Sequence, residues 1–437
     1  MGALGIDIGT SSVSLAILGD SGDEAGSLTY SNDSLVKGDR WENLQDAGLI
    51  ASKVVSVAED LVSRNREIGA IGLSGQMHGI LYVDKTGRAV SPLFTWQDGR
   101  GDLPFRDGSS YAQTLSALTG YKLSTGYGLV THYYNLLNGL VPAEAARICT
   151  VMDYAVMALT GSCSPVIDPS NAASLGCFDL ESLSFDTDAL SKAGIDPSML
   201  PDVSPTPSFQ GFFRGIPVAT AIGDNQASFL GSVRSPGKAV HVTVGTSSQI
   251  SVFTKEYSTA PGIDIRPLPG GGYLLVGAAL CGGSALALLN GFLGGTARFL
   301  TGSEPDPDLI YERMGSVAFR PASESGLSVS TTFRGTREEP SVRGRIDNVS
   351  FDNWNIEDLV LGFHRGIADE LYSFYETMPA SSREGKCVVV GSGNALRRNR
   401  LLRETVESRF GLRLELSQVC EEAAFGASLV ANRLIHR

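Results

Sequence analysis

Apolar positions along the chain form two runs of the same kind, one at residues 4–18 and the other at residues 240–253. In both runs, apolar and small residues alternate on either side of a Gly-Thr-Ser-Ser tetrapeptide, which begins at Gly9 and again at Gly245. Alternation is typical of strands, and a small polar tetrapeptide between strands is typical of a tight turn. The pattern therefore predicts a β-hairpin that occurs twice.

Helical and strand-like patterns alternate in the rest of the chain. Apolar residues at helical spacing predict helices at residues 44–61, 152–161, 356–378 and 421–435, and short apolar runs predict strands at residues 70–74, 80–83, 217–223 and 387–390. A turn-rich joint at residues 232–239 precedes the second hairpin. We therefore expect an α/β protein of two domains around a central cleft, at residues 1–233 and 234–437.

Composition narrows the class of protein. The 437 residues are 42% apolar and carry a net charge of −12, which argues against a nucleic-acid partner. The sequence has no apolar run of membrane-spanning length and no signal-like start, so we expect no membrane association and a cytoplasmic location. Six scattered cysteines without Cys-x-x-Cys spacing predict free, mostly buried thiols, and the five dispersed histidines form no recognisable zinc site.

The two predicted turns are the first candidates for chemistry. Backbone N–H groups and hydroxyls of small residues converge on anions, so a pair of such turns could hold a polyphosphate, with Asp7 beside the first turn. The alternative is a plain hairpin turn. A strand, the loop Gly391-Ser392-Gly393-Asn394 and a helix follow late in the chain, an arrangement that suits an anion or nucleotide.

Asp224 is the candidate general base, because it stands where a predicted strand ends and a helix begins. The same position suits an ordinary helix N-cap. The loop Gln76-Met77-His78 also follows a strand and is a candidate for a polar ligand, although His78 could be a half-buried histidine with its hydrogen bonds satisfied.

A third loop, at residues 93–100, contains Trp96, Asp98 and Arg100. Trp96 could stack on a ligand or fill the core, and for a single tryptophan the core is commoner. Asp98 and Arg100 could form only a surface ion pair.

Seven motifs in order, DIGTSS, SGQMHG, TWQDGR, GDNQ, the second GTSS, GSGNALRRN and EEAAFGASL, resemble the FGGY family of carbohydrate kinases over nearly the whole chain. The resemblance implies two ribonuclease-H-like (actin-like ATPase) domains, ATP and Mg²⁺ as cofactors, and a homodimer as one candidate assembly. Within the family the motifs are most similar to kinases of the seven-carbon ketose sedoheptulose, which implies phosphorylation of its terminal primary hydroxyl to give sedoheptulose 7-phosphate.

The resemblance also implies roles for individual residues. Asp224 becomes the base, and Asp7 lies beside the metal and the phosphates. The residues that it assigns to ATP are Asp7, Gly9, Thr10, Ser11, Ser12, Gly245, Thr246, Ser247, Gly391, Gly393 and Asn394. Those that it assigns to the sugar are Gln76, Met77, His78, Trp96, Asp98 and Asn225.

Three alternatives stay open from the sequence: a kinase of a pentulose such as xylulose or ribulose, a non-catalytic nucleotide switch, and a sugar sensor on the same fold. One departure from the family's sequence pattern keeps the sugar-sensor alternative open. Gly335-Thr336-Arg337 stands where many family members have Gly-Glu-Arg, so a contact of that glutamate is lost or is made by Glu338.

Overall fold

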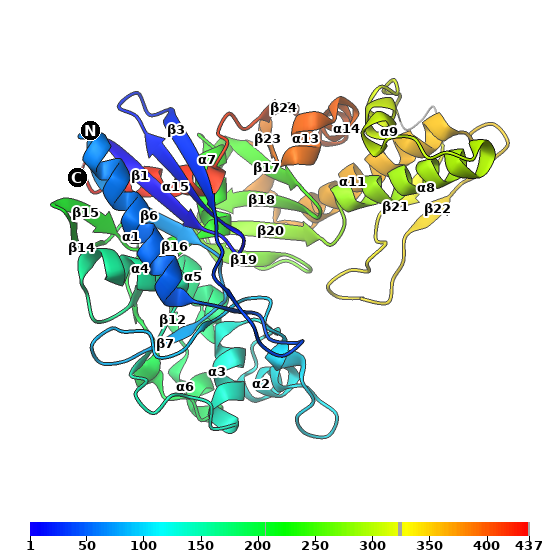
Figure 1. Cartoon of the computed structure of the whole chain (residues 1–437). Helices are drawn as coiled ribbons and strands as arrows, with labels where there is room; N and C mark the ends of the chain where they lie inside the picture. The colour runs from blue at the N-terminus through cyan, green and yellow to red at the C-terminus, as the bar shows by residue number, and fades with distance from the viewer. Residues whose placement is uncertain (206, 322–325, 436–437) are drawn as a thin grey trace. The chain divides into compact units, whose positions relative to one another are not determined.

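The computed structural model describes residues 1–205, 207–321 and 326–435 and divides into two compact units (Figure 1). Unit 1 consists of Met1–Gly231, Arg266–Gly272 and Val419–Arg437, and unit 2 of Ser232–Ile265 and Tyr273–Gln418. No helix in the described ranges combines the length and apolar character needed to cross a bilayer. Three of the six free cysteines, Cys163, Cys387 and Cys420, are exposed, so the prediction of mostly buried thiols was wrong.

Unit 1 is organised around a mixed sheet that begins with the first predicted hairpin. In spatial order its strands are β14 (Phe209–Phe213), β15 (Ile216–Ala219), β6 (Ile68–Gly75), β1 (Gly2–Ile8), β2 (Ser12–Leu18) and β3 (Glu24–Ser31), and β16 (Ile222–Gly223) also pairs with β6. The strands β1, β2 and β3 are antiparallel, whereas β6 runs parallel to β1 and both β15 and β16 run parallel to β6.

Side chains of β1 alternate between two differently packed faces of this sheet. Leu4 and Ile6 pack in a large apolar core with α1 (Ala47–Arg64) and α4 (Val151–Thr160). Ala3 lies on the other face, in a cluster of small residues with α15 (Glu422–Asn432). A Cβ added at Gly5 would lie 1.7 Å from the carbonyl oxygen of Ala424, so glycine lets this helix approach the sheet closely.

The helix α15 corrects the predicted domain boundaries. Sequence analysis assigned residues 421–435 to the second domain, but α15 packs on β1, β2 and β6 of unit 1. Its small residues match glycines of β1 and β6, and that complementarity is a tertiary property with no local pattern. The break at Gly231/Ser232 lies close to the predicted joint.

The remaining part of unit 1 lies mostly between β6 and β14 and has its own apolar core. Its strands are β4 (Leu35–Val36), β5 (Leu44–Gln45), β7 (Leu81–Val83), β8 (Leu93–Phe94), β9 (Arg147–Cys149), β10 (Val166–Ile167), β11 (Phe178–Asp179), β12 (Ser184–Phe185) and β13 (Asp202–Val203). Its helices are α2 (Tyr111–Thr119), α3 (Gly128–Leu137), α5 (Pro169–Leu175) and α6 (Thr187–Lys192), with the 3₁₀ turns Gly99–Asp102 and Pro197–Met199, and α7 (Asp224–Ser232) follows the strand β16.

Unit 2 repeats the strand order of unit 1. Its sheet runs β19 (Asp264–Pro267), β20 (Tyr273–Ala279), β18 (Ser248–Thr254), β17 (Ala239–Val244), β23 (Val388–Ser392) and β24 (Arg413–Leu416). Here β17, β18 and β20 are antiparallel, and β23 and β24 continue in parallel from β17. Three antiparallel strands followed by parallel ones therefore occur twice, as the duplicated hairpin predicts.

Helices and a small sheet complete unit 2. They are the 3₁₀ turn Pro236–Lys238, α8 (Gly283–Thr301), α9 (Pro307–Gly315), α11 (Ile356–Thr377), α12 (Ala380–Arg383), α13 (Asn394–Arg398), α14 (Arg400–Phe410), β21 (Ser328–Ser330) and β22 (Arg345–Asp347). The long helix α11 contributes a buried stripe, including Ile367 and Leu371, to the core of this unit.

Candidate active site

Two carboxylates of unit 1 meet at one edge of its sheet. Asp7 lies near the carboxyl end of β1 and pairs in register with Ser74 of β6, which in turn pairs with Ile222 of β16. Asp224 follows β16 directly and is the first residue of α7. Because β1, β6 and β16 are parallel, their carboxyl ends share one edge, where ligands of open α/β sheets usually bind.

The surroundings of these two carboxyls disfavour their charged forms. Burial raises the pKa of Asp7 to about 6, and the negative charge of Glu421 adds to this, although Ser74 Oγ donates a 2.7 Å hydrogen bond to Asp7 Oδ1. Burial also raises the pKa of Asp224 to about 7, and the charge of Asp7 raises it further, against the opposing effects of the Asn225 N–H and Arg266. Strongly shifted, mutually repelling carboxyls are typical of catalytic sites.

The first hairpin turn is held by side chains from two other loops. Gly9 N donates to Ser12 O (2.8 Å), and Trp96 Nε1 donates to Thr10 Oγ1 (3.0 Å). Thr10 Oγ1 in turn donates to Gln76 Oε1 (3.3 Å). Trp96 is 45% exposed, so the hypothesis that it fills the core was wrong. Gln76 is buried and contacts the first hairpin turn, so a residue that the resemblance assigns to the sugar is joined to one that it assigns to ATP.

A residue that sequence analysis missed completes this support. Gln45 Nε2 donates to the carbonyl oxygen of Thr10 (2.7 Å), and Gln45 Oε1 accepts from Gln76 Nε2 (2.8 Å). Gln45 belongs to the two-residue strand β5, and no motif in the sequence marks it. The one sequence signal at this position is an amide side chain at the start of the amphipathic pattern at residues 44–61.

His78 is half-buried, and one of its ring nitrogens is held by a hydrogen bond. Its Nδ1 donates to the carbonyl oxygen of Ser174 (2.8 Å), and its ring stacks on Tyr127 with centroids 4.6 Å apart. The backbone φ of 73° is unusual for a residue other than glycine and indicates a strained loop. Such strain is common at ligand-binding loops, and the hydrogen bond fixes which ring nitrogen carries the proton.

The same region holds buried acceptors that have no hydrogen-bond partner within the described structure. These are the Oδ1 atoms of Asn225, next to Asp224, and of Asn171, on α5. Asn171 Nδ2 donates to the carbonyl oxygen of Ala221, just before β16, which places it near the same strand. Unsatisfied buried acceptors cost free energy unless a ligand or water satisfies them, so both amides suit the hydroxyls of a polyol. Asn171 was not among the residues predicted for the site.

Asp98 is fully buried, and its ion pair with Arg100 is not on the surface, so the surface-pair hypothesis was wrong. Arg100 Nε lies 2.6 Å from Asp98 Oδ1, and Asn43 N donates to Asp98 Oδ2. The guanidinium of Arg100 also lies 4.2 Å from the ring centroid of Phe94. These contacts occupy both carboxylate oxygens of Asp98 and anchor the loop that carries Trp96.

In unit 2, the second hairpin turn is joined to the start of α8. Gly245 N donates to Ser247 O (2.9 Å), and Gly282 N donates to the carbonyl oxygen of Thr246 (3.0 Å). A Cβ added at Gly282 would lie 2.4 Å from Ser247 O, so this approach requires glycine. The second turn is thus held by backbone hydrogen bonds of its own and of the start of α8.

The glycine loop after β23 lies at the same edge of the unit 2 sheet. Because β23 is parallel to β17, the last residues of β23, which include Gly391, and Gly393 directly after them lie beside the end of the strand that leads into the second hairpin turn. Gly393 has a φ of 87°, and a Cβ there would lie 2.5 Å from Val244 O. Asn394 begins α13, so Gly391, Gly393 and Asn394 are brought beside the residues of the second turn within this unit.

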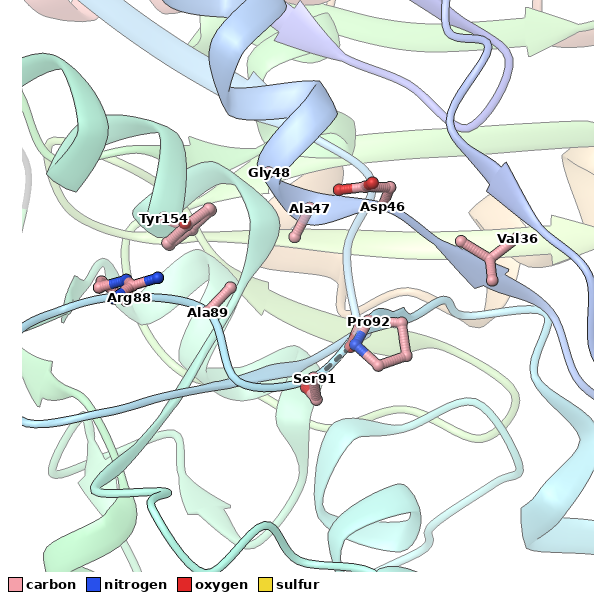
Figure 2. A pocket seen from close by; sticks show the side chains of 9 residues that line it. All are labelled: Val36, Asp46, Ala47, Gly48, Arg88, Ala89, Ser91, Pro92 and Tyr154. Atoms are coloured by element: carbon pink, nitrogen blue, oxygen red, sulfur yellow. Dashed lines mark hydrogen bonds between the residues drawn. The ribbon is translucent and has the colours of Figure 1, made fainter.

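A separate hollow of about 420 Å³ lies elsewhere on unit 1 (Figure 2). It is formed by the start of α1, the segment around Pro92, and the side chains of Arg88 and Tyr154. It contains none of the predicted site residues, so the candidate active site does not depend on it.

A sheet that begins with a hairpin and continues in parallel strands, present once in each unit, is the mark of the duplicated ribonuclease-H-like class of proteins. The model of the FGGY family of carbohydrate kinases, N-terminal domain, matches residues 2–231. The sedoheptulokinases of Mus musculus and Homo sapiens are 31% and 30% identical to the chain, covering 98% of it and 96% and 97% of their own lengths. The chain belongs to the FGGY family of carbohydrate kinases.

Solved structures agree with this fold. A ligand-bound xylulose kinase from Lactobacillus acidophilus superposes with a TM-score of 0.80 at 19% identity, covering 100% of this chain and 89% of that one. The glycerol kinase of Plasmodium falciparum with ADP has a TM-score of 0.80 at 18% identity, with coverages of 99% and 89%. The predicted α/β fold of two actin-like ATPase domains is confirmed, and the chain is a sugar kinase whose family uses ATP.

Proposed function

We propose that the chain transfers the γ-phosphoryl group of ATP to the terminal primary hydroxyl of sedoheptulose, giving sedoheptulose 7-phosphate and ADP. The choice of sugar rests on similarity to two sedoheptulokinases along almost their full lengths. The observation that carries the catalytic assignment is Asp224, which stands at a strand end beside Asp7 with a pKa raised to about 7. A carboxylate with that pKa accepts a proton near neutral pH far better than an ordinary aspartate.

The proposed step balances as a simple displacement. The hydroxyl oxygen of the sugar bonds to the γ-phosphorus while the bond from that phosphorus to the β,γ-bridging oxygen breaks, and ADP leaves. Asp224 receives the hydroxyl proton. Thr10, Ser11 and Ser12 of the first turn would donate hydrogen bonds to the phosphates, because phosphoryl transfer depends mainly on positioning and neutralisation of charge.

Unit 2 carries the other residues that we propose for the nucleotide. Under this proposal Thr246 and Ser247 contact the phosphates, and Gly391, Gly393 and Asn394 border the adenosine. On the sugar side, Asn225 and His78 would bind hydroxyls, with Asn171 as a further partner. Gln76, Trp96 and Asp98 would act less directly, because in the structure their polar atoms hold the first turn and its loop.

The residues present fit a magnesium ion. No group of three or more His, Cys, Asp or Glu side chains within the described ranges is arranged to hold a metal. Mg²⁺ at kinase sites instead uses one or two carboxylates and the substrate phosphates. Asp7 is the proposed ligand, since a nearby cation would relieve the repulsion between Asp7 and Asp224. When bound, the ion would neutralise charge on the phosphates.

The test is ADP release in the presence of Mg²⁺ with sedoheptulose, xylulose, ribulose, fructose and glycerol, for wild type and Asp224→Ala. We expect the highest kcat/KM with sedoheptulose and loss of turnover in the variant, with ATP binding retained. A higher kcat/KM with xylulose or ribulose would make the chain a pentulose kinase. ATP binding without stimulation by any of the sugars would contradict the proposal and favour the sensor.

A further inference from the structure

One face of the unit 2 sheet carries polar side chains beside the second hairpin turn. Val240, Val242 and Val244 of β17 belong to the apolar core, so the residues between them, His241 and Thr243, lie on the opposite face. His241 is nevertheless only 3% exposed. Removal of an imidazole from water costs free energy unless hydrogen bonds compensate for it, so the partners of this ring are informative.

Three side chains on this face form a hydrogen-bonded line. His241 Nε2 lies 3.0 Å from Ser392 Oγ, and Ser392 Oγ lies 2.8 Å from Thr243 Oγ1. Ser392 is buried and stands between Gly391 and Gly393 in the glycine loop. Thr243 pairs in register with Ser392, two residues before the second turn begins. Thr243 therefore lies between the two segments of unit 2 that we propose for the nucleotide.

The duplicated sheet provides an internal comparison for Thr243. Asp7 stands two residues before the glycine of the first turn, as Thr243 does before the glycine of the second. Asp7 pairs in register with Ser74 of the neighbouring parallel strand and accepts its hydrogen bond at 2.7 Å. Thr243 and Ser392 repeat this pairing, at 2.8 Å. A carboxylate meets a phosphate through a cation, whereas a hydroxyl can donate to the phosphate directly.

The hydrogen-bonded line has two possible orders of donation. If Thr243 donates to Ser392 and Ser392 donates to His241 Nε2, the Thr243 hydrogen is used within the protein. If His241 Nε2–H donates to Ser392 and Ser392 donates to Thr243, the Thr243 hydrogen is left for a ligand. An anion accepts hydrogen bonds and has none to donate, so a phosphate selects the second order.

We propose that His241 is a positioning residue of the nucleotide site, which acts through Ser392 to direct the Thr243 hydroxyl hydrogen towards a phosphate oxygen of ATP. This inference rests on the proposed function, under which the phosphates bind beside the second turn. Burial lowers the pKa of His241 to about 4, so the ring is neutral near pH 7 and one of its two nitrogens carries the hydrogen. The order of donation is therefore a choice between two tautomers, and the bound phosphate fixes it.

Calorimetric titration of the whole chain with MgATP, without sugar, tests the Thr243 contact. Thr243→Val keeps the shape of the side chain without its hydroxyl and should weaken binding at least about tenfold, the value of one hydrogen bond to a charged group. Thr243→Ser should bind like wild type. Equal binding by wild type and Thr243→Val would overturn this inference alone, whereas a wild type that binds no MgATP would refute the proposed function as well.

Ser251→Ala is the matched control for loss of a buried hydroxyl. Ser251 is 1% exposed and pairs in register with His241, and its Oγ accepts a 3.1 Å hydrogen bond from Gln249 Nε2. It lies outside the line that ends at Thr243, so Ser251→Ala should bind MgATP like wild type. Equal losses in Ser251→Ala and Thr243→Val would indicate general damage to this face and overturn the proposal.

A double-mutant cycle separates positioning by His241 from a purely structural role. His241→Leu removes the Nε2 donor and should weaken MgATP binding about fivefold, the value of one neutral hydrogen bond. His241→Gln carries an amide N–H of similar reach and should restore most of the affinity. In the Thr243→Val background, His241→Leu should have no further effect, because His241 acts only through that hydroxyl. The same loss in both backgrounds would overturn the positioning role.

Side-chain ¹⁵N spectra of histidine-labelled protein report the tautomer directly. The His241 resonances can be assigned by their absence from the spectrum of His241→Gln. With MgATP bound, we expect the hydrogen of His241 on Nε2. A hydrogen on Nδ1 with a bare Nε2 would overturn the proposed order of donation.

Discussion

Asp224→Asn should stabilise the ligand-free protein at neutral and alkaline pH while it removes the proposed base. The substitution keeps the size of the side chain and eliminates its negative charge. In the folded chain, burial and the charge of Asp7 oppose ionisation and raise the pKa of Asp224 to about 7. The unfolded chain has no such opposition, so it ionises at an ordinary aspartate pKa of about 4.

The size and sign of this effect follow from proton linkage. A shift of about three pKa units corresponds to at most about 4 kcal/mol, and partial access of water to the carboxyl reduces this to about 1–2 kcal/mol. Between pH 4 and pH 7 the folded state holds a proton on Asp224 that the unfolded state has lost. The proton on Asp224 therefore stabilises the folded state at low pH, and this stabilisation disappears as the pH rises through about 7.

The contribution of Asp224 to the free energy of unfolding can be measured by urea unfolding of wild type and Asp224→Asn at pH 5, 6, 7 and 8, without nucleotide or metal. Between pH 5 and 8 wild type should lose about 1–2 kcal/mol of unfolding free energy relative to the variant. Kinase turnover of the variant should fall about 10³-fold, within the range for loss of a general base. Parallel pH dependences for the two proteins would refute the reasoning.

Asp84→Asn is a control for which we expect a change in stability of the opposite sign. Hydrogen bonds from Thr86, and from the N–H of Arg88, lower the pKa of the exposed Asp84 carboxyl. Its contribution is thus present above pH 4 and is lost on acidification, so Asp84→Asn should be less stable than wild type at pH 7. Equal behaviour of the two variants would mean that the assay does not report the local environment.

Three substitutions test other contacts. Trp96→Phe removes the N–H that supports the first turn, and kcat/KM should fall about tenfold, the value of one hydrogen bond; unchanged steady-state kinetics would contradict this role. Gly5→Ala should destabilise the fold by about 3 kcal/mol because its Cβ would overlap α15. Thermal unfolding measures this loss, with Gly26→Ala as the control because its Cβ has open space. Gly282→Ala would force its Cβ against Ser247 O and should raise the KM for ATP, with a normal KM for ATP as the contrary result.

Local patterns were sufficient to predict much of the fold. The alternation around Gly9 and Gly245 identified both hairpins, and helical spacing identified α1, α4 and α11 to within a few residues. These features depend on neighbours in sequence, which is why periodicity detects them. The carboxylates Asp7 and Asp224 could be selected for a related reason, because each stands at the end of an apolar run.

Other features depend on contacts between distant segments. The burial of Asp98 depends on Arg100 and on the backbone of Asn43, and neither contact leaves a periodic trace. Gln45 supports the first turn from a two-residue strand, and Asn171 belongs to the short helix α5. A hydrogen bond between such segments exists only once the chain is packed, so the sequence could suggest candidates but not their partners.

The close fit of α15 to the sheet of unit 1 also sets an order for biosynthesis. The ribosome must make nearly all of unit 2 after α7 before α15 exists, a delay of roughly 10–40 s at ordinary elongation rates. Until then the glycine-lined face of β1 and β6 has no cover, although its hairpin and α1 are already present. The nascent first half is therefore expected to wait as an incomplete intermediate, which is a natural substrate for chaperones. The sheet edge that carries Asp7 and Asp224 is expected to reach its final structure only when α15 docks.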